Sequence, residues 1–199
     1  MARSNRTRYA VLGMLAIGKR SGYDLKKEFE RRMSHFWAES LGQIYPTLKQ
    51  LLDEGMVRAH RDSGTGRRVR TVYSITARGR KELSAWLQDP PQTEQVRNEM
   101  LLKLYFGPEL GVESAVTHLS RFETEQRRVL EVMEGFQPEI AEVAESGEQE
   151  LFWKITLASG LHVIRARIAW CQEARCMLEK WRQSEGQTKP RALRRLEAS

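Results

Sequence analysis

Arginine side chains gather around a short glycine-rich segment in the first half of the chain. Arg61, Arg67, Arg68 and Arg70 lie in or beside the sequence DSGTGRR, whose two glycines favour a turn. The flanking segments alternate apolar and polar residues, as β-strands do. A guanidinium presents a rigid fork of donors that fits phosphate oxygens or inserts into a narrow minor groove. The sequence therefore predicts a basic hairpin for duplex DNA, with a hairpin that is basic by chance as the alternative.

A helix is predicted immediately before this hairpin. Pro46 is tolerated only in a first turn, so the helix proper begins near Ile44, and Gly55 supplies a left-handed stop. The residues expected to form its buried face are Ile44, Leu48, Leu51 and Leu52, and those expected to face solvent are Gln43, Tyr45, Thr47 and Lys49. Amide, hydroxyl and ammonium groups can contact base edges and phosphates, although an ordinary polar helix face would have a similar composition.

Three more helices complete a winged-helix pattern. Residues 8–17 predict an apolar helix, and Ser21 is expected to cap a second helix over residues 23–36. Its apolar positions Leu25, Phe29, Met33 and Phe36 lie on one helical face. Thr76 is expected to cap a helix over residues 77–87. In such a domain a helix enters the major groove while the hairpin contacts the phosphate backbone.

The distribution of charge divides the chain into two halves. The chain has 199 residues and a net charge of +7; residues 1–90 hold 18 basic and 9 acidic groups, whereas residues 91–199 hold 15 and 17. The basic excess predicts that a polyanion binds the first half. We expect a mainly α protein with a winged-helix DNA-binding domain (1–90), a helical dimerisation domain (91–183) and a flexible basic tail (184–199).

Other functional classes find little support in the sequence. It contains no nucleophile elbow, P-loop or dinucleotide-binding motif, so we expect neither an enzyme nor a cofactor. The four histidines are scattered singly, which predicts no metal site. Cys171 and Cys176 are expected to be buried and reduced, with redox sensing as the alternative. No apolar run approaches the roughly 20 residues that span a bilayer, and we expect a cytoplasmic protein.

Three ordered motifs within residues 8–90 resemble those of PadR-type transcriptional regulators. Gly22-Tyr23 opens the second predicted helix, IYPTLKQLLDEG occupies residues 44–55, and YSITARG occupies residues 73–79. The resemblance implies a dimeric, sequence-specific DNA-binding protein, usually a repressor. The residues that it places at or near DNA, besides the four arginines, are Tyr23, Ser40, Gln43, Tyr45, Thr47 and Lys49. The tyrosine rings could instead serve the core. Arg3, Arg6 and Arg8 could add a basic arm or belong to a disordered terminus.

The second half of the chain predicts helices over residues 93–106, over residues 111–135 with an end at Pro138, and from about residue 148. The last of these carries an apolar stripe at heptad-like spacing, which consists of Leu157, Leu161, Ile164, Ile168, Cys171 and Leu178. We expect this stripe to form a dimer interface. An intramolecular helical hairpin is the alternative. The resemblance agrees with this expectation, because longer PadR-type proteins dimerise through a C-terminal helical domain.

The resemblance also suggests a small hydrophobic or aromatic effector. Trp37, Trp153 and Trp170 are candidates to line its site, because tryptophan stacks on aromatic ligands, but it suits any interface equally. We expect a homodimeric repressor that binds an inverted repeat through the third helix and the hairpin. The alternatives are a winged-helix protein-interaction module and a nonspecific nucleic-acid-binding protein. The sequence leaves open the operator, the regulated gene, the sign of regulation and whether an effector exists.

Overall fold

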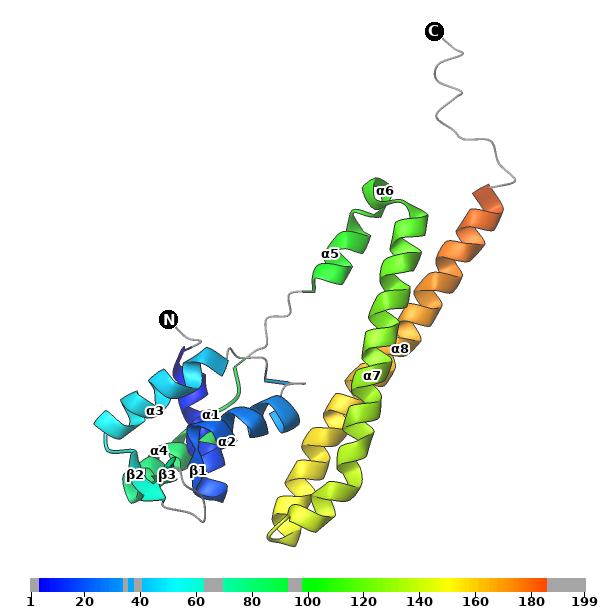
Figure 1. Ribbon diagram of the computed structural model, residues 1–199. Helices are drawn as coiled ribbons and strands as arrows, with labels where there is room; N and C mark the ends of the chain where they lie inside the picture. Colours follow the sequence, from blue (N-terminus) through cyan, green and yellow to red (C-terminus); the bar gives the residue numbers. More distant parts are fainter. Residues whose placement is uncertain (1–3, 34–35, 38–40, 63–69, 93–97, 186–199) are drawn as a thin grey trace. The chain divides into compact units, whose positions relative to one another are not determined.

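The computed structural model describes residues 4–33, 36–37, 41–62, 70–92 and 98–185. These residues belong to two compact units, Met1–Glu94 and Gln95–Ser199, each of which is described by itself (Figure 1). Mainly helical secondary structure and one small sheet confirm the expected fold class. Within the described part of the chain, no helix is both long and apolar enough to cross a membrane.

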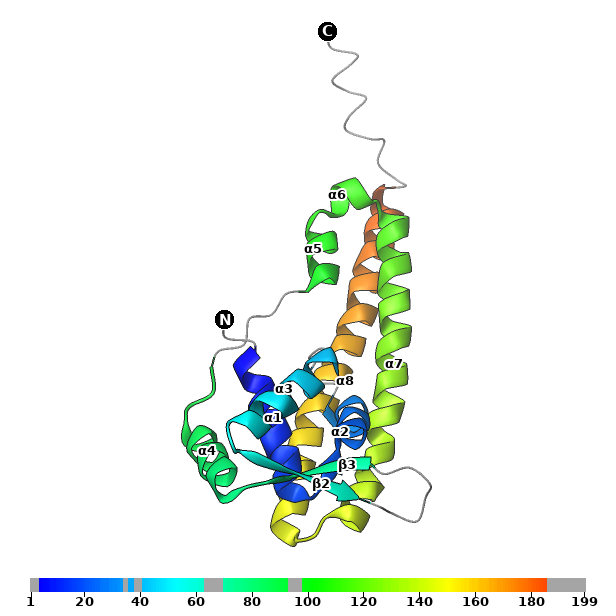
Figure 2. The same cartoon turned by 60° about the vertical axis from the view of Figure 1, so that its left-hand side comes forward.

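The first unit is a winged helix. Its elements are α1 (Ser4–Ile17), β1 (Arg20–Ser21), α2 (Gly22–Glu28), a π-helical turn (Phe29–Met33), a 3-10 turn (Leu41–Gln43), α3 (Ile44–Asp53), β2 (Val57–Asp62), β3 (Arg70–Ile75) and α4 (Ala77–Gln88). The sheet is antiparallel in the order β1-β3-β2, and its β2–β3 hairpin, hereafter the wing, is seen in Figure 2. The strand β1 was not predicted, because two residues are too short to show an alternation.

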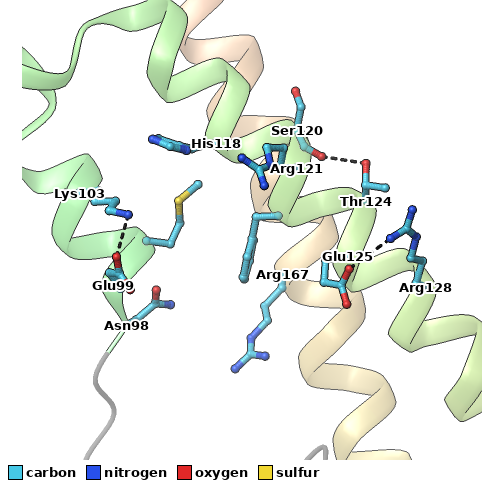
Figure 3. Close-up of a pocket in the computed structure, with 12 residues that line it drawn as sticks. Asn98, Glu99, Lys103, His118, Ser120, Arg121, Thr124, Glu125, Arg128 and Arg167 are labelled. Atoms are coloured by element: carbon cyan, nitrogen blue, oxygen red, sulfur yellow. Dashed lines mark hydrogen bonds and ion pairs between the residues drawn. The ribbon is translucent and has the colours of Figure 1, made fainter.

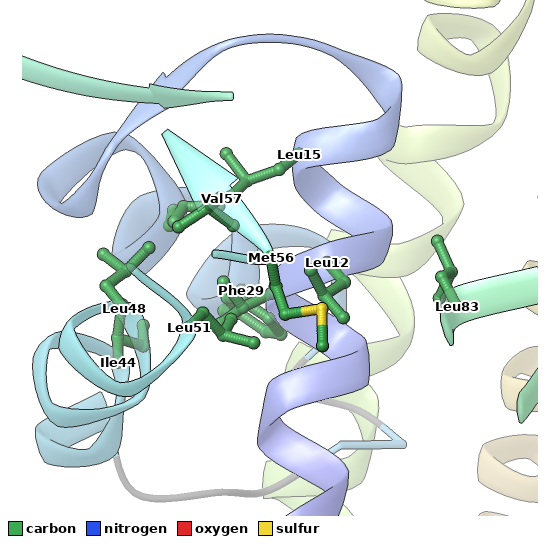
Figure 4. Packing of buried hydrophobic residues seen from close by; sticks show 11 residues of the cluster. Leu12, Leu15, Phe29, Ile44, Leu48, Leu51, Met56, Val57 and Leu83 are labelled. Atoms are coloured by element: carbon green, nitrogen blue, oxygen red, sulfur yellow. The ribbon is translucent and has the colours of Figure 1, made fainter. Parts of the chain in front are cut away.

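One apolar core fastens α1, α2 and α3 to the sheet. Leu12, Leu25 and Leu51 have no exposed surface, and Figure 4 shows the leucines of α1 and α3 meeting Val57 at the start of β2. Two residues that were predicted to lie in the core do not lie there. Leu52 is 40% exposed and Phe36 is 50% exposed, because α3 turns Leu52 to its outer face and α2 gives way to the π-helical turn before Phe36.

Close packing explains the glycines of two motifs. A Cβ atom at Gly79 would lie 2.3 Å from the carbonyl oxygen of Met56, a distance that no side chain tolerates. At Gly22 it would lie 2.6 Å from the ring of Tyr45. Gly55 has a φ of 69° at the end of α3, which confirms the predicted left-handed stop. The motif glycines therefore allow helices and strands to approach one another closely.

The predicted caps hold α2 and α4. The Ser21 hydroxyl accepts a hydrogen bond from the Asp24 backbone N–H, and the Asp24 carboxylate accepts one from the Ser21 backbone N–H. This reciprocal arrangement is a capping box. The Thr76 hydroxyl accepts from the Gly79 N–H at 3.1 Å and lies 2.9 Å from the Gly55 carbonyl oxygen. Thr76 thus joins the start of α4 to the end of α3.

The second unit consists of α5 (Glu99–Tyr105), α6 (Gly107–Leu110), α7 (Val112–Val143) and α8 (Gly147–Glu185). The two long helices form an antiparallel hairpin (Figures 1 and 2). The expectation that Pro138 ends a helix is wrong, since α7 runs through it. Pro138 removes one N–H donor, but Met133 and Ile140 on either side of it are buried against α8, and this packing keeps the helix continuous.

The apolar stripe of α8 faces α7 of the same chain. Leu157, Leu161, Ile164 and Ile168 pack with Met133 and Ile140 of α7, and Cys171 is fully buried. The alternative of an intramolecular hairpin therefore describes the stripe, and it corrects the expectation that these side chains meet a partner subunit. Leu178 is only partly buried. Cys176 is exposed, contrary to expectation, because it lies on another face of α8 from Cys171.

A polar cluster interrupts the packing between α7 and α8. Glu123 is only 6% exposed, and its carboxylate lies 2.6 Å from Arg127, 2.7 Å from Arg175 and 3.2 Å from the amide nitrogen of Gln172. The hydrogen bond from Arg127 is the main cause of the lowered pKa of Glu123, and it outweighs the burial that acts to raise this pKa. Glu123 is therefore an ionised group that joins both helices of the hairpin.

Candidate nucleic-acid interface

The outer face of α3 and the end of the 3-10 turn before it expose three of the four residues that the sequence predicted to face solvent. Gln43, Tyr45 and Lys49 are exposed. Thr47 is only 7% exposed, so the expectation that it is available to solvent is wrong. Its position explains this, because residues three and four apart share a helix face and Thr47 lies with Ile44, Leu48 and Leu51 against the core.

Two tyrosines lie where α2 begins and where α3 begins. Tyr45 is 56% exposed, and part of its ring packs over the backbone of Gly22. Tyr23 is 57% exposed, with the Lys27 ammonium 4.8 Å from the centre of its ring. Each tyrosine therefore combines a local packing role with a surface that a ligand can reach. The contact between Tyr45 and Gly22 places the first turns of α2 and α3 next to each other, and their exposed side chains are here taken together as one surface.

The base of the wing adjoins this surface through an ion pair. Arg70, the first residue of β3, is exposed, and its Nη1 lies 3.6 Å from Oδ2 of Asp24 in α2. Arg61 of β2 is exposed as well. Ser40, Arg67 and Arg68, the other predicted DNA-binding residues, lie outside the described residues. Within the described part, α2, α3 and the wing bring together an exposed group of aromatic, amide and cationic side chains.

Arg8 does not belong to a free basic arm. It lies within α1, and its guanidinium is 2.7 Å from Glu54 at the end of α3 and 2.5 Å from Glu82 in α4. Burial acts to lower the pKa of Arg8, but the hydrogen bond with Glu54 and the nearby charge of Glu82 raise it. Arg6 binds the side chain of Gln92. Arg3 lies outside the described residues. Arg8 therefore ties three helices together, which fixes the direction of α3.

Sequence reasoning did not identify Asp24 as part of this surface. An acidic residue within a basic region does not by itself indicate phosphate binding. Its position three residues after the N-cap Ser21 is the one available signal, because a carboxylate there is directed back toward the helix start.

The second unit contains an open groove of about 910 Å³ (Figure 3). Figure 3 shows side chains of α5 on one side and of α7 on the other, with Arg167 of α8 below. None of the three candidate tryptophans lines this groove. Trp37 packs against the core of the first unit and Trp153 against that of the second. The ring of Trp170 meets that of Phe122, a groove residue, edge to face with 6.4 Å between centroids. The structure therefore does not bring the three tryptophans together around this groove.

Family models match both units. A model of the transcriptional regulator PadR-like family matches residues 11–85, and a model of the virulence activator alpha C-terminal domain matches residues 96–179. The chain belongs to the PadR-like family. The PadR-like family comprises transcriptional regulators, so this chain is a regulator and not an enzyme. Among the described residues, no group of histidine, cysteine or acidic side chains could hold a metal ion.

Known PadR-like proteins resemble the chain in sequence and in structure. The negative transcriptional regulator PadR of Bacillus subtilis is 38% identical over 100 residues, which span 50% of this chain and 55% of that relative. The crystal structure of B. subtilis PadR in complex with operator DNA has a TM-score of 0.75 at 27% identity, covering 86% of this chain and 98% of the other. Its complex with p-coumaric acid has a TM-score of 0.70 at 26% identity, with coverages of 90% and 98%.

Proposed function

We propose that this PadR-like chain is a homodimeric repressor that binds an inverted repeat in double-stranded DNA. In this proposal α3 of each subunit enters a major groove, the two sites are about one helical turn apart, and the wings contact phosphates. The observation that carries the proposal is the exposed face of Gln43, Tyr45 and Lys49 beside the cationic base of the wing. The operator complex of B. subtilis PadR supports it.

Competition binding tests this proposal. The purified chain is titrated into a labelled duplex from the region upstream of its own gene, with random duplex as competitor and at two salt concentrations. We expect binding to a palindromic segment that resists the competitor. Equal affinity for both duplexes would indicate a nonspecific nucleic-acid-binding protein. No affinity for either would indicate a protein-interaction module.

Gln43→Ala separates base recognition from phosphate binding. Loss of a base contact costs about 1–3 kcal/mol and relaxes the preference for one site, whereas loss of a phosphate contact weakens all duplexes alike. We expect the first behaviour for Gln43→Ala and the second for Arg61→Ala. Lys81→Ala is the matched control, because Lys81 is an exposed cation of α4. Unchanged affinity in the first two variants would contradict the assignment of α3 and the wing.

The homodimer needs a surface other than the heptad stripe, because α7 of the same chain covers that stripe. We propose that the partner covers the exposed apolar side chains of the long hairpin. Phe152, Ile155 and Met177 of α8 are 59%, 56% and 64% exposed, and Val132 of α7 is 59% exposed. Apolar side chains exposed in this number on one element are typical of a protein–protein interface.

An effector completes the proposed repressor. We infer that a small hydrophobic or aromatic compound relieves DNA binding, in keeping with the p-coumaric acid complex of B. subtilis PadR. Each of Trp37, Trp153 and Trp170, taken singly, remains a proposed contact of the compound. Titration with p-coumaric acid should quench tryptophan fluorescence and release bound duplex, with cyclohexane carboxylate as a non-aromatic control. Quenching without release of the duplex would contradict a regulatory role for the compound.

A further inference from the structure

An acidic side chain stands within the surface that is proposed to bind DNA. Oδ2 of Asp24 lies 3.6 Å from Nη1 of Arg70, the residue with which the wing returns to the sheet. The two side chains are 33% and 59% exposed, so the pair is accessible to solvent. A carboxylate at this place would repel phosphates if it acted by its charge alone. The capping box accounts for its place at the start of α2, and its contact with Arg70 allows a second role.

The Asp24 carboxylate is held in one direction by the capping box. The same oxygen, Oδ2, accepts a hydrogen bond from the Ser21 backbone N–H at 3.1 Å and one from the Ser21 hydroxyl at 2.8 Å. Ser21 is itself fixed in β1, where it pairs with Val72 of β3. Partial burial acts to raise the pKa of Asp24, but these hydrogen bonds and the charges of Arg70 and Arg20 keep it below its ordinary value. Asp24 is therefore an ionised and rigid acceptor.

A rigid acceptor can direct a flexible cation. An exposed arginine side chain has many rotamers, and restricting it to one costs free energy whenever it must meet a ligand. A guanidinium carries five N–H donors, more than one carboxylate oxygen can accept. A contact with Asp24 therefore restricts Arg70 in advance without engaging all of its donors.

We propose that Asp24 is a positioning residue, which orients Arg70 at the base of the wing for contact with a DNA phosphate. The inference rests on the proposed DNA-binding function and adds to it a coupling between α2 and the wing. In this account the negative charge of Asp24 favours DNA binding, because the free energy gained by orienting Arg70 exceeds the repulsion between Asp24 and the DNA backbone.

A double-mutant cycle tests this inference on the full chain. Asp24→Asn removes the charge but retains an oxygen that can accept from Ser21, and Arg70→Ala removes the cation. We expect Asp24→Asn to weaken duplex binding about two- to fivefold, the range for an exposed ion pair, and to make the affinity less dependent on salt. In the Arg70→Ala background, Asp24→Asn should no longer weaken binding.

Two controls exclude simpler explanations. Ser21→Ala removes the capping hydroxyl while the carboxylate stays, so a loss of binding that comes from the helix cap alone would appear in this variant as well. Glu30→Gln removes an exposed carboxylate from the neighbouring turn, where Glu30 lies 3.9 Å from Lys26. It should bind duplex at least as tightly as the wild type. The Ser21 hydroxyl also holds the Asp24 carboxylate, so Ser21→Ala is measured in the Arg70→Ala background too, and a loss that persists there would assign the effect to capping and overturn the inference.

The remaining outcomes depend on whether Asp24→Asn weakens or strengthens duplex binding. If Asp24→Asn binds duplex more tightly than the wild type, or weakens it equally with and without Arg70, Asp24 does not position Arg70. Failure of the proposed function is distinguishable, because the wild type itself would then show no preference for the palindromic segment. The inference fails in that case too, whereas a specific wild type with an additive cycle would overturn the inference alone.

Discussion

The two units of the chain differ in which apolar and charged side chains they bury. The winged helix gathers Leu12, Leu25 and Leu51 in a core with no exposed surface, and its buried polar residues are uncharged. The α7–α8 hairpin buries the ionised Glu123 between its helices and leaves Phe152 and Ile155 more than half exposed. The second unit therefore exposes more large apolar side chains than the first, although Phe36, Leu52 and Leu87 of the first unit are exposed as well.

This difference suggests that the two units have different roles. A domain whose core is complete can present polar and cationic groups to a ligand without changing its own packing. A hairpin whose outer side chains are apolar gains free energy when another surface covers them. The buried ion cluster fixes how α7 and α8 align, because a shifted alignment would leave charges unpaired. In this view, the first unit is organised for binding and the second for assembly.

Truncation of one leucine in each unit should give the largest contrast. Leu51→Ala should lower the free energy of unfolding by about 2–5 kcal/mol, because the site is fully buried and a cavity remains. Leu151→Ala, at a site that is 55% exposed, should lower it by less than about 1 kcal/mol in the monomer. Urea denaturation followed by circular dichroism, at a concentration where the chain is monomeric, measures both. Equal losses would contradict the contrast between the units.

Removal of the buried carboxylate should have the next largest effect. Glu123→Ala removes the carboxylate that accepts from Arg127, Arg175 and Gln172, and we expect a loss of about 2 kcal/mol in the free energy of unfolding. Glu125→Ala is the control, because Glu125 is 62% exposed and pairs with Arg128 at 3.6 Å. A loss no greater than that of the control would show that the cluster does not hold the hairpin.

The same cluster predicts a dependence on pH. A carboxylate whose pKa is lowered on folding stabilises the folded state above its ordinary pKa of 4.5, and this contribution is lost as the pH falls through the lowered value. The stability difference between the wild type and Glu123→Gln should therefore be constant near pH 7 and should shrink as the pH falls below about 4.5. Thermal unfolding between pH 7 and pH 3 measures it. A difference that grows in acid would contradict the assignment.

Introducing a charge on the hairpin should have the smallest effect on the folding of the chain and yet disrupt its assembly. Phe152→Asp should raise the dissociation constant of the proposed dimer at least tenfold, which is about 1.4 kcal/mol, while the unfolding of the monomer changes little. Leu87→Asp places the same charge at a residue of the winged helix that is 66% exposed. It should leave the dimer intact. Sedimentation equilibrium of both variants measures the contrast, and dissociation by Leu87→Asp alone would reverse it.

Local patterns were sufficient to predict the winged helix. The cap residues Ser21 and Thr76, the stop at Gly55 and the basic hairpin all depend on neighbours in the sequence, and the structure contains the caps, the stop and both strands. Thr47 was predicted wrongly because its polarity was given more weight than its helical phase. The phase alone places it with Leu48 and Leu51.

Tertiary contacts determine what the sequence could not provide. The heptad stripe of α8 is equally suited to a partner subunit and to α7, and only the fold shows which one it meets. Pro138 resembles a helix end until α8 is present to hold both sides of it. The ion pair between Asp24 and Arg70 joins residues that are distant in the chain. No local pattern encodes it.

The contact between Gly79 and the Met56 carbonyl has a consequence for how operators can diversify. Any chain that keeps this turn needs glycine at this position, whatever DNA it recognises, because a Cβ atom would meet the carbonyl oxygen. The motif thus reports a steric requirement of folding, and it carries no information about base sequence. Gln43 and Lys49 have exposed side chains without such a requirement. If these two residues contact DNA as proposed, substitutions there can change the target genes while the glycine that the fold requires stays the same.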